Sequence, residues 1–137
     1  MGRTQPNTIL LVDDEASFRE LIRPVLEHAG YRVREAPGFE EAVEVSRRRG
    51  TRVDLLLTDV SLPGNNGYEL AAQLAESRPT LKVIFMSGSA GIEAFKFYAT
   101  PESDVRLLRK PFEMRELLDR VDRALNSKGW QMGQAGS

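Results

Sequence analysis

The sequence contains no cysteine, which excludes disulfide bonds and metal sites built from thiolates. It also has no excess of charge of either sign, because 19 lysine and arginine residues stand against 20 aspartate and glutamate residues. The resulting net charge of −1 provides no overall basic footprint for nucleic acid. The arginine-rich stretch 47–52 is more typical of a solvated helix C-terminus. We therefore expect no direct nucleic-acid partner.

Long apolar runs are absent too, so we expect no membrane insertion. The first residues, MGRTQPNT, lack the apolar core of a signal peptide, which favours a cytoplasmic location. A length of 137 residues suits one domain, and 41% hydrophobic residues are enough for a globular core. We expect flexible tails at 1–7 and 128–137, since the second is rich in glycine and has no apolar period.

Short apolar stretches rich in branched residues alternate with segments of helical spacing. The first, third and fourth stretches are nearly continuous apolar runs, as expected for strands that are covered on both faces. The order strand–helix, repeated along the chain, predicts an α/β fold with a parallel sheet and helices on both faces. The predicted strands lie within residues 8–14, 31–36, 53–59, 81–87 and 105–110. The predicted helices carry apolar stripes within residues 18–29, 39–43, 70–75 and 114–125.

Two helical segments depart from a regular pattern. Residues 91–103 should contain the fourth helix, but their aromatic residues form no clean stripe and Pro101 would end the helix early. We expect a short or irregular helix there. Pro24 falls inside the first stripe, removes one backbone hydrogen bond and should kink that helix.

Polar and charged residues follow four of the five predicted strands. Asp13 and Asp14 end the first strand, Asp59 the third, Ser87 the fourth and Lys110 the fifth. In an open parallel sheet, ligands bind beyond the carboxyl ends of the strands, where the strand order reverses. With the order 2-1-3-4-5, these side chains would converge in one pocket. A single such residue could be an ordinary loop residue or helix cap, but five together favour a functional site.

Three crowded carboxylates repel one another unless a cation compensates their charge. Oxygen ligands that leave room for water suit Mg²⁺, and Lys110 supplies a second positive charge. Such a site is suited to a phosphoryl group, whose oxygens the metal and the lysine can neutralise while a carboxylate attacks in line. Ser87 could donate a hydrogen bond to the attached group.

Four sequence motifs resemble those of a response-regulator receiver domain from two-component signalling. They are LLVDDE at 10–15, LLLTDVSLPGNNG at 55–67, MSG at 86–88 and LLRKPF at 107–112. The resemblance covers residues 8–127. It implies a flavodoxin-like, doubly wound sheet of five parallel strands in the order 2-1-3-4-5.

The resemblance also implies roles for individual residues. Asp59 resembles the phosphoryl acceptor, which would be loaded by a histidine kinase or a histidine phosphotransfer protein. Asp13 and Asp14 resemble the metal-binding pair, and the backbone carbonyl of Ser61 resembles a further ligand of the Mg²⁺ ion that Asp59 also contacts. The domain would catalyse its own phosphorylation and dephosphorylation, and would not be an enzyme with a separate substrate.

Ser87 resembles the switch hydroxyl of the family, and Lys110 the lysine that pairs with the phosphoryl group. The resemblance further implies a cis peptide bond between Lys110 and Pro111. The chain departs from the family at Leu107, where an aromatic residue usually turns inward on activation, and at Leu62, which replaces a methionine. We therefore expect activation to reorder residues 88–103, without a rotating aromatic side chain.

Other interpretations remain open at this point. A pseudo-receiver would bind a partner protein without phosphorylation, and Leu107 is compatible with that function. An aspartyl-phosphate phosphatase of the haloacid-dehalogenase type would need an acid two residues after the nucleophile, where this chain has Ser61. Too few residues follow position 127 for an output domain. The chain would thus be a stand-alone regulator or a segment of a longer protein such as a hybrid kinase, whose receivers the PGNNG and MSGSAG stretches resemble.

Overall fold

A computed structural model of the chain describes residues 5–88 and 107–126. Its centre is a five-stranded parallel sheet in the order β2-β1-β3-β6-β7. Counted along the predicted strands, this is the expected order 2-1-3-4-5, so the predicted fold class is confirmed. The strands are β1 (Thr8–Val12), β2 (Arg32–Ala36), β3 (Leu55–Asp59), β6 (Lys82–Ser87) and β7 (Leu107–Arg109).

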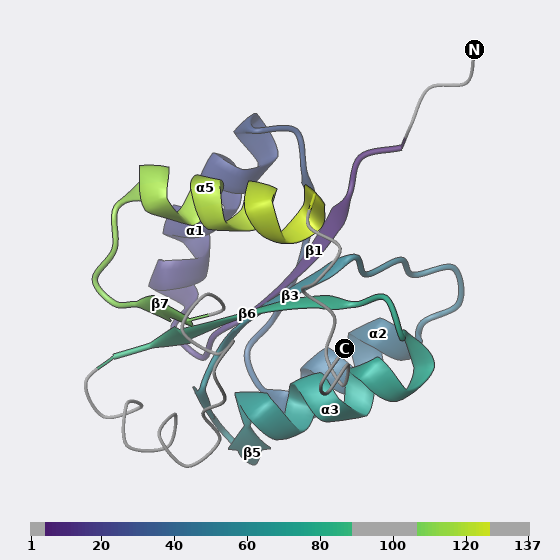
Figure 1. Cartoon of the computed structure of the whole chain (residues 1–137). Coiled ribbons are helices and arrows are strands. Elements are labelled where there is room, and N and C mark those ends of the chain that lie inside the picture. The colour runs from purple at the N-terminus through teal and green to yellow at the C-terminus, as the bar shows by residue number, and fades with distance from the viewer. Residues whose placement is uncertain (1–4, 89–106, 127–137) are drawn as a thin grey trace, which may run out of the picture.

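Helices cover both faces of this sheet, as Figure 1 shows. Helices α1 (Ala16–His28) and α5 (Met114–Asn126) lie on one face, and α2 (Phe39–Arg47) and α3 (Gly67–Ser77) lie on the other. The described residues contain no helix that is both long and apolar enough to span a bilayer.

The apolar strands form two cores, one on each side of the sheet. Successive side chains of a strand point to opposite faces, so Ile9 and Leu11 pack towards α1 and α5, whereas Leu10 and Val12 pack towards α2 and α3. All four are completely buried. This double burial explains why the strand is an uninterrupted apolar run, and each such side chain stabilises the fold by roughly 1.5–3 kcal/mol.

The ends of the helices follow from local sequence. Gly30, which follows the last turn of α1, has φ +103°, a conformation that glycine adopts without strain. Helix α1 continues through Pro24 to His28. At the start of α3, the Asn66 side chain accepts a hydrogen bond from the backbone N–H of Glu69 at 2.9 Å and caps the helix.

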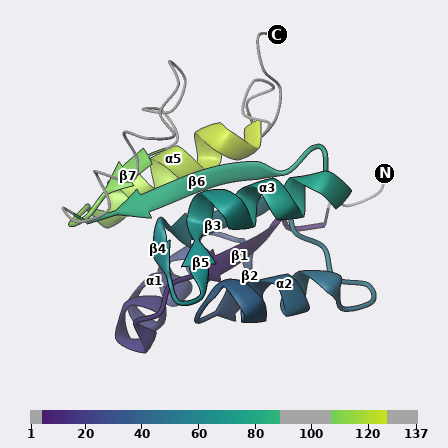
Figure 2. The same ribbon diagram turned by 90° about the horizontal axis from the view of Figure 1, so that it is seen from below.

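A small antiparallel hairpin between β3 and α3 was not predicted. It consists of β4 (Ser61–Leu62) and β5 (Asn65–Asn66), joined by a turn in which Gly64 has φ +88°. Figure 2 shows the hairpin beside the first turn of α3. The expected irregular helix at 91–103 and most of the expected tails lie outside the described residues.

Candidate functional site

One lysine joins the ends of two strands at the carboxyl edge of the sheet. The Nζ atom of Lys110 donates hydrogen bonds to Oδ2 of Asp13 at 2.7 Å and to Oδ2 of Asp59 at 2.8 Å. Asp13 precedes Lys110 by 97 positions in the sequence, and Asp59 precedes it by 51. The three residues meet because β1, β3 and β7 end at the same edge of the sheet. The structure thus brings together three of the residues that the sequence singled out.

Asp13 is fixed by contacts on several sides. It is completely buried, and its Oδ1 atom accepts a hydrogen bond from the backbone N–H of Glu15 at 2.9 Å. Its carbonyl oxygen accepts a hydrogen bond from Arg19 on α1, and Arg19 in turn donates to Glu35 of β2 at 2.9 Å. A buried carboxylate needs such partners, because an unpaired charge in the interior is expensive.

Asp59 stands at the end of β3 with 15% of its side chain exposed, so it is held in place and still reachable. Its Oδ1 atom accepts a hydrogen bond from the backbone N–H of Ser61 at 2.8 Å, while Oδ2 faces Lys110. The hydroxyl of Thr58 donates to the Asp59 carbonyl oxygen at 2.9 Å. Gly67 lies against that same oxygen, since a Cβ atom on Gly67 would be only 2.4 Å away from it.

The charges of this group depend on one another. Burial raises the pKa of Asp59, with a contribution from the neighbouring Asp13 carboxylate, and these effects outweigh the hydrogen bonds from Lys110 and Ser61. Burial alone would lower the pKa of Lys110, but its hydrogen bonds to Asp13 and Asp59 prevail and raise it. Lys110 therefore stays an ammonium ion at neutral pH and compensates the two carboxylates.

Other predicted site residues take different positions. Asp14 is exposed, and in residues 5–88 and 107–126 no three Asp, Glu, His or Cys side chains come close enough to hold a metal ion. Among the described residues, Lys110 joins two of the three expected carboxylates, Asp13 and Asp59, and the metal-binding role of Asp14 stays a prediction. Ser61 is exposed and contacts Asp59 through its backbone N–H.

Ser87 is completely buried, and its hydroxyl donates to the carbonyl oxygen of Gly88 at 3.0 Å. Its own carbonyl accepts a hydrogen bond from the backbone N–H of Lys110 at 2.8 Å. The peptide bond from Lys110 to Pro111 is cis, as predicted. Leu107 is buried beside its strand partner Phe85 in the core that faces α2 and α3.

The donor chemistry of the edge is compatible with Mg²⁺. Asp13 and Asp59 present carboxylate oxygens close enough to share one cationic partner, which is the Lys110 ammonium in this arrangement. Asp14 adds an exposed carboxylate one residue after Asp13. Carboxylate and carbonyl oxygens are the ligands that Mg²⁺ prefers, usually together with several waters.

Sequence reasoning missed an aromatic contact of Lys110. Its Nζ atom lies over the ring of Phe18 from α1, 4.1 Å from the ring centroid. Phe18 in turn meets Phe112 edge to face, with centroids 6.0 Å apart and planes at 87°. The position of Phe18 in the apolar stripe of the first helix indicated core packing alone.

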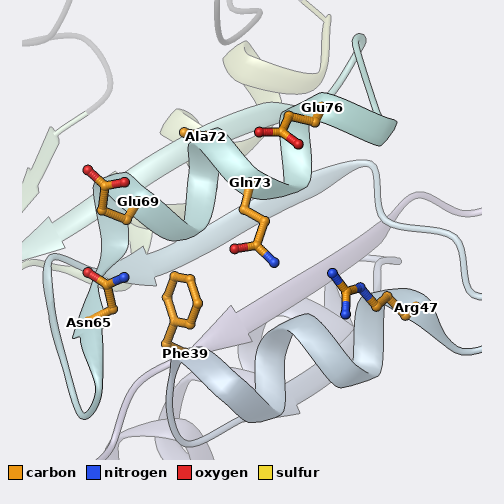
Figure 3. Close-up of a pocket in the computed structure, with 7 residues that line it drawn as sticks. All are labelled: Phe39, Arg47, Asn65, Glu69, Ala72, Gln73 and Glu76. Atoms are coloured by element: carbon orange, nitrogen blue, oxygen red, sulfur yellow. The ribbon is translucent and has the colours of Figure 1, made fainter.

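A cavity of about 390 Å³ lies elsewhere, between α2 and α3. Figure 3 shows Phe39 and Arg47 of α2 facing Gln73 and Glu76 of α3 across it. None of the residues at the acidic edge lines this cavity, so it is separate from the candidate site.

Comparison with known proteins places this geometry in a family. The chain is 34% identical over 117 residues to the response regulator receiver protein CpdR of Brucella abortus, covering 85% of this chain and 95% of that protein. It is 39% identical over 123 residues to the phosphate regulon transcriptional regulatory protein PhoB of Pseudomonas aeruginosa, covering 89% of this chain. The chain spans about half of PhoB, at 53% of its length.

Solved structures agree with the sequence relatives. A response regulator receiver protein from Sinorhizobium medicae has a TM-score of 0.79 and 29% identity, covering 90% of this chain and 98% of that one. The receiver domain of the hybrid histidine kinase CckA has a TM-score of 0.71 and 31% identity, covering 87% and 99%. A family model described as the response regulator receiver domain matches residues 9–122. With its parallel sheet and the Asp13–Lys110–Asp59 group at the carboxyl edge, this chain belongs to the response regulator receiver domain family.

Proposed function

We propose that Asp59 accepts a phosphoryl group from a histidine kinase or a histidine phosphotransfer protein in a Mg²⁺-dependent reaction. The observation that carries this proposal is the bridge from Lys110 to both Asp13 and Asp59. It puts a fixed cation beside a carboxylate that is still partly exposed. The proposal includes a cytoplasmic location and requires neither nucleic acid nor a membrane.

In this reaction an Asp59 carboxylate oxygen attacks phosphorus in line with the leaving group. A P–O bond to Asp59 forms, the bond from phosphorus to the donor nitrogen breaks, and the donor imidazole leaves with its electron pair. The N–H of Ser61 and the ammonium of Lys110 hold the two oxygens of Asp59 before the donor arrives, which lowers the entropy lost on reaction.

Charge compensation is the second contribution of the site. Lys110 can donate a hydrogen bond to the phosphoryl oxygens, since its ammonium already lies 2.8 Å from Asp59 Oδ2. Ser87 would turn its hydroxyl from the Gly88 carbonyl towards the attached group. Asp13, Asp14, Asp59 and the carbonyl of Ser61 would hold Mg²⁺, which supplies further neutralisation of the phosphoryl charge.

A pseudo-receiver is the second candidate function. One observation favours it: buried Leu107 replaces the usual aromatic residue. Such a domain would bind its partner equally well without phosphate. An aspartyl-phosphate phosphatase is a weaker candidate, because Ser61 offers no acid for protonating a leaving group.

Incubation with Mg²⁺ and acetyl phosphate, followed by intact-mass measurement, tests the proposal. We expect one added phosphoryl group, labile to hydroxylamine, that is lost in Asp59→Asn and when EDTA removes the metal. Asp54→Asn is a matched control, because Asp54 is another partly buried aspartate that accepts hydrogen bonds, from Thr8 and Arg52. Unchanged phosphorylation of Asp59→Asn would show that another residue is the acceptor. A wild-type chain that takes up no phosphoryl group would favour the pseudo-receiver.

A further inference from the structure

The ammonium of Lys110 has three close contacts, and one of them is not a charge. Besides Asp13 and Asp59, the Phe18 ring lies 4.1 Å from Nζ, well inside the roughly 6 Å range of a cation–π interaction. Only 18% of the Lys110 side chain is exposed. Little water competes for the ammonium, which strengthens its attraction to the ring face.

The ring itself is held from two sides. Phe18 comes from α1, and the edge-to-face contact with Phe112 joins it to the segment that leads from β7 into α5. Both side chains pack against the core that includes Ile22 and Leu117. The ring face under Lys110 is therefore part of a rigid aromatic support, not a freely rotating surface side chain.

The contacts of Lys110 with the two carboxylates, unlike its contact with the ring, would change during the proposed reaction. If Asp59 is phosphorylated and Asp13 binds Mg²⁺, both must share or give up their hydrogen bonds with Lys110. Phe18 cannot bind a metal and cannot be phosphorylated, so its contact persists while the other two change. Resting on the proposed function, we propose that Phe18 is a positioning residue that holds the Lys110 ammonium at the acceptor when the carboxylates change partners.

Nuclear magnetic resonance of the lysine ε-methylene groups tests the contact without phosphorylation. The chain has four lysines, so these signals are few and assignable. The ring current of Phe18 should shift the Lys110 ε-protons upfield in the metal-free protein, in saturating Mg²⁺ and in Asp59→Asn. Phe18→Leu should abolish the shift, whereas Phe39→Leu, which removes a half-buried ring on the other face of the sheet, should leave it unchanged.

Phosphorylation kinetics test the consequence. Phe18→Leu should slow phosphorylation by acetyl phosphate roughly fivefold, the size of a partly desolvated cation–π contact, and Phe18→Tyr should restore the rate. Phenylalanine analogues with one, two or three ring fluorines, incorporated at position 18, should slow it stepwise. These analogues keep nearly the same shape but make the electrostatic potential at the ring face less negative, which weakens its attraction to the ammonium. If Phe18 acted through packing alone, the rate would be unchanged.

Three results would overturn the proposal. The first is the absence of an upfield Lys110 signal in the wild-type protein, and the second is its loss when Mg²⁺ binds or when Asp59→Asn removes a partner. The third is an equal rate across the fluorinated series. A wild-type chain that accepts no phosphate while its Lys110 signal stays upfield in Mg²⁺ refutes the proposed function, but leaves the ring as the support of the lysine.

Discussion

Gly67 touches the carbonyl oxygen of Asp59 so closely that an added Cβ atom would lie 2.4 Å from it. Because the obstacle is backbone, Gly67→Ala must push α3 away from β3. We expect a loss of about 1–3 kcal/mol in the free energy of unfolding, typical of overpacking, and slower phosphorylation of the displaced Asp59. Chemical denaturation and intact-mass kinetics measure the two effects. Gly38→Ala is the control, since its nearest neighbour is the flexible end of Glu41 at 3.0 Å, and an equal loss there would contradict the explanation.

Glu35 should make stability depend on pH. Burial would raise the pKa of its carboxyl, but hydrogen bonds from Arg23 and Arg19 outweigh burial and lower it below 4.5. The Glu35 carboxyl therefore binds a proton more readily in the unfolded chain than in the folded protein. Ionised Glu35 stabilises the fold above about pH 4.5, and this contribution disappears as the pH falls through the lowered pKa of the folded state.

Glu35→Gln should accordingly reduce the free energy of unfolding by about 1 kcal/mol at neutral pH, and by much less at about pH 3. Urea denaturation at both pH values measures the difference. Glu27→Gln should have a smaller effect, since the Glu27 side chain is 46% exposed and bonds only Arg23 among the described residues. A deficit for Glu35→Gln that is independent of pH would exclude the ion pairs as its cause.

Asp14 tests the metal site, because it is predicted to be a ligand but is exposed, and no group of three potential ligands forms among the described residues. Asp14→Ala should weaken Mg²⁺ binding at least about tenfold, measured by calorimetric titration. Since Asp14 is exposed, metal-free stability should change little. Mg²⁺ should raise the melting temperature of the wild type by linkage, but far less in the variant. Equal affinities in Asp14→Ala and in the surface control Glu44→Ala would remove Asp14 from the site.

Leu107 offers a test of how closely its core is packed. It is 4% exposed and pairs in register with Phe85. The ring centroid of Phe85 lies 4.4 Å from that of Tyr68. Leu107→Tyr, which introduces an aromatic residue of the kind usual in the family, should therefore cost about 1–3 kcal/mol, and Leu107→Ile less than about 1.5 kcal/mol. Thermal unfolding compares the two. A tyrosine variant as stable as the wild type would show that unused space remains beside Phe85.

The sheet and the ends of its strands could be predicted from sequence for a simple reason. Strands buried on both faces are apolar throughout, so a charged residue that ends such a run stands out, as Asp13 and Asp59 do. The order of the strands came mainly from the motifs, since periodicity alone does not determine which strands pair.

Other features leave weaker signals. Two-residue strands such as β4 and β5 have no measurable period, and the hairpin depends on the turn at Gly64. The close approach of Gly67 to Asp59 depends on how α3 packs on β3. Phe18 looks like any core phenylalanine in a helical stripe, because sequence spacing does not reveal that its ring faces an ammonium ion. The expected reordering of 88–103 falls mostly outside the described residues and stays a prediction for hydrogen exchange.

Because the sheet divides the core into two layers, two adjacent residues can be used to monitor the two layers separately. Leu10 and Leu11 are consecutive, yet one belongs to the layer of α2 and α3 and the other to the layer of α1 and α5. Methyl resonances of this pair would register the two layers separately, although the two residues are consecutive and only Val12 separates them from Asp13. Whichever of the two signals moves on phosphorylation would identify the side of the sheet through which the acceptor communicates with the surface.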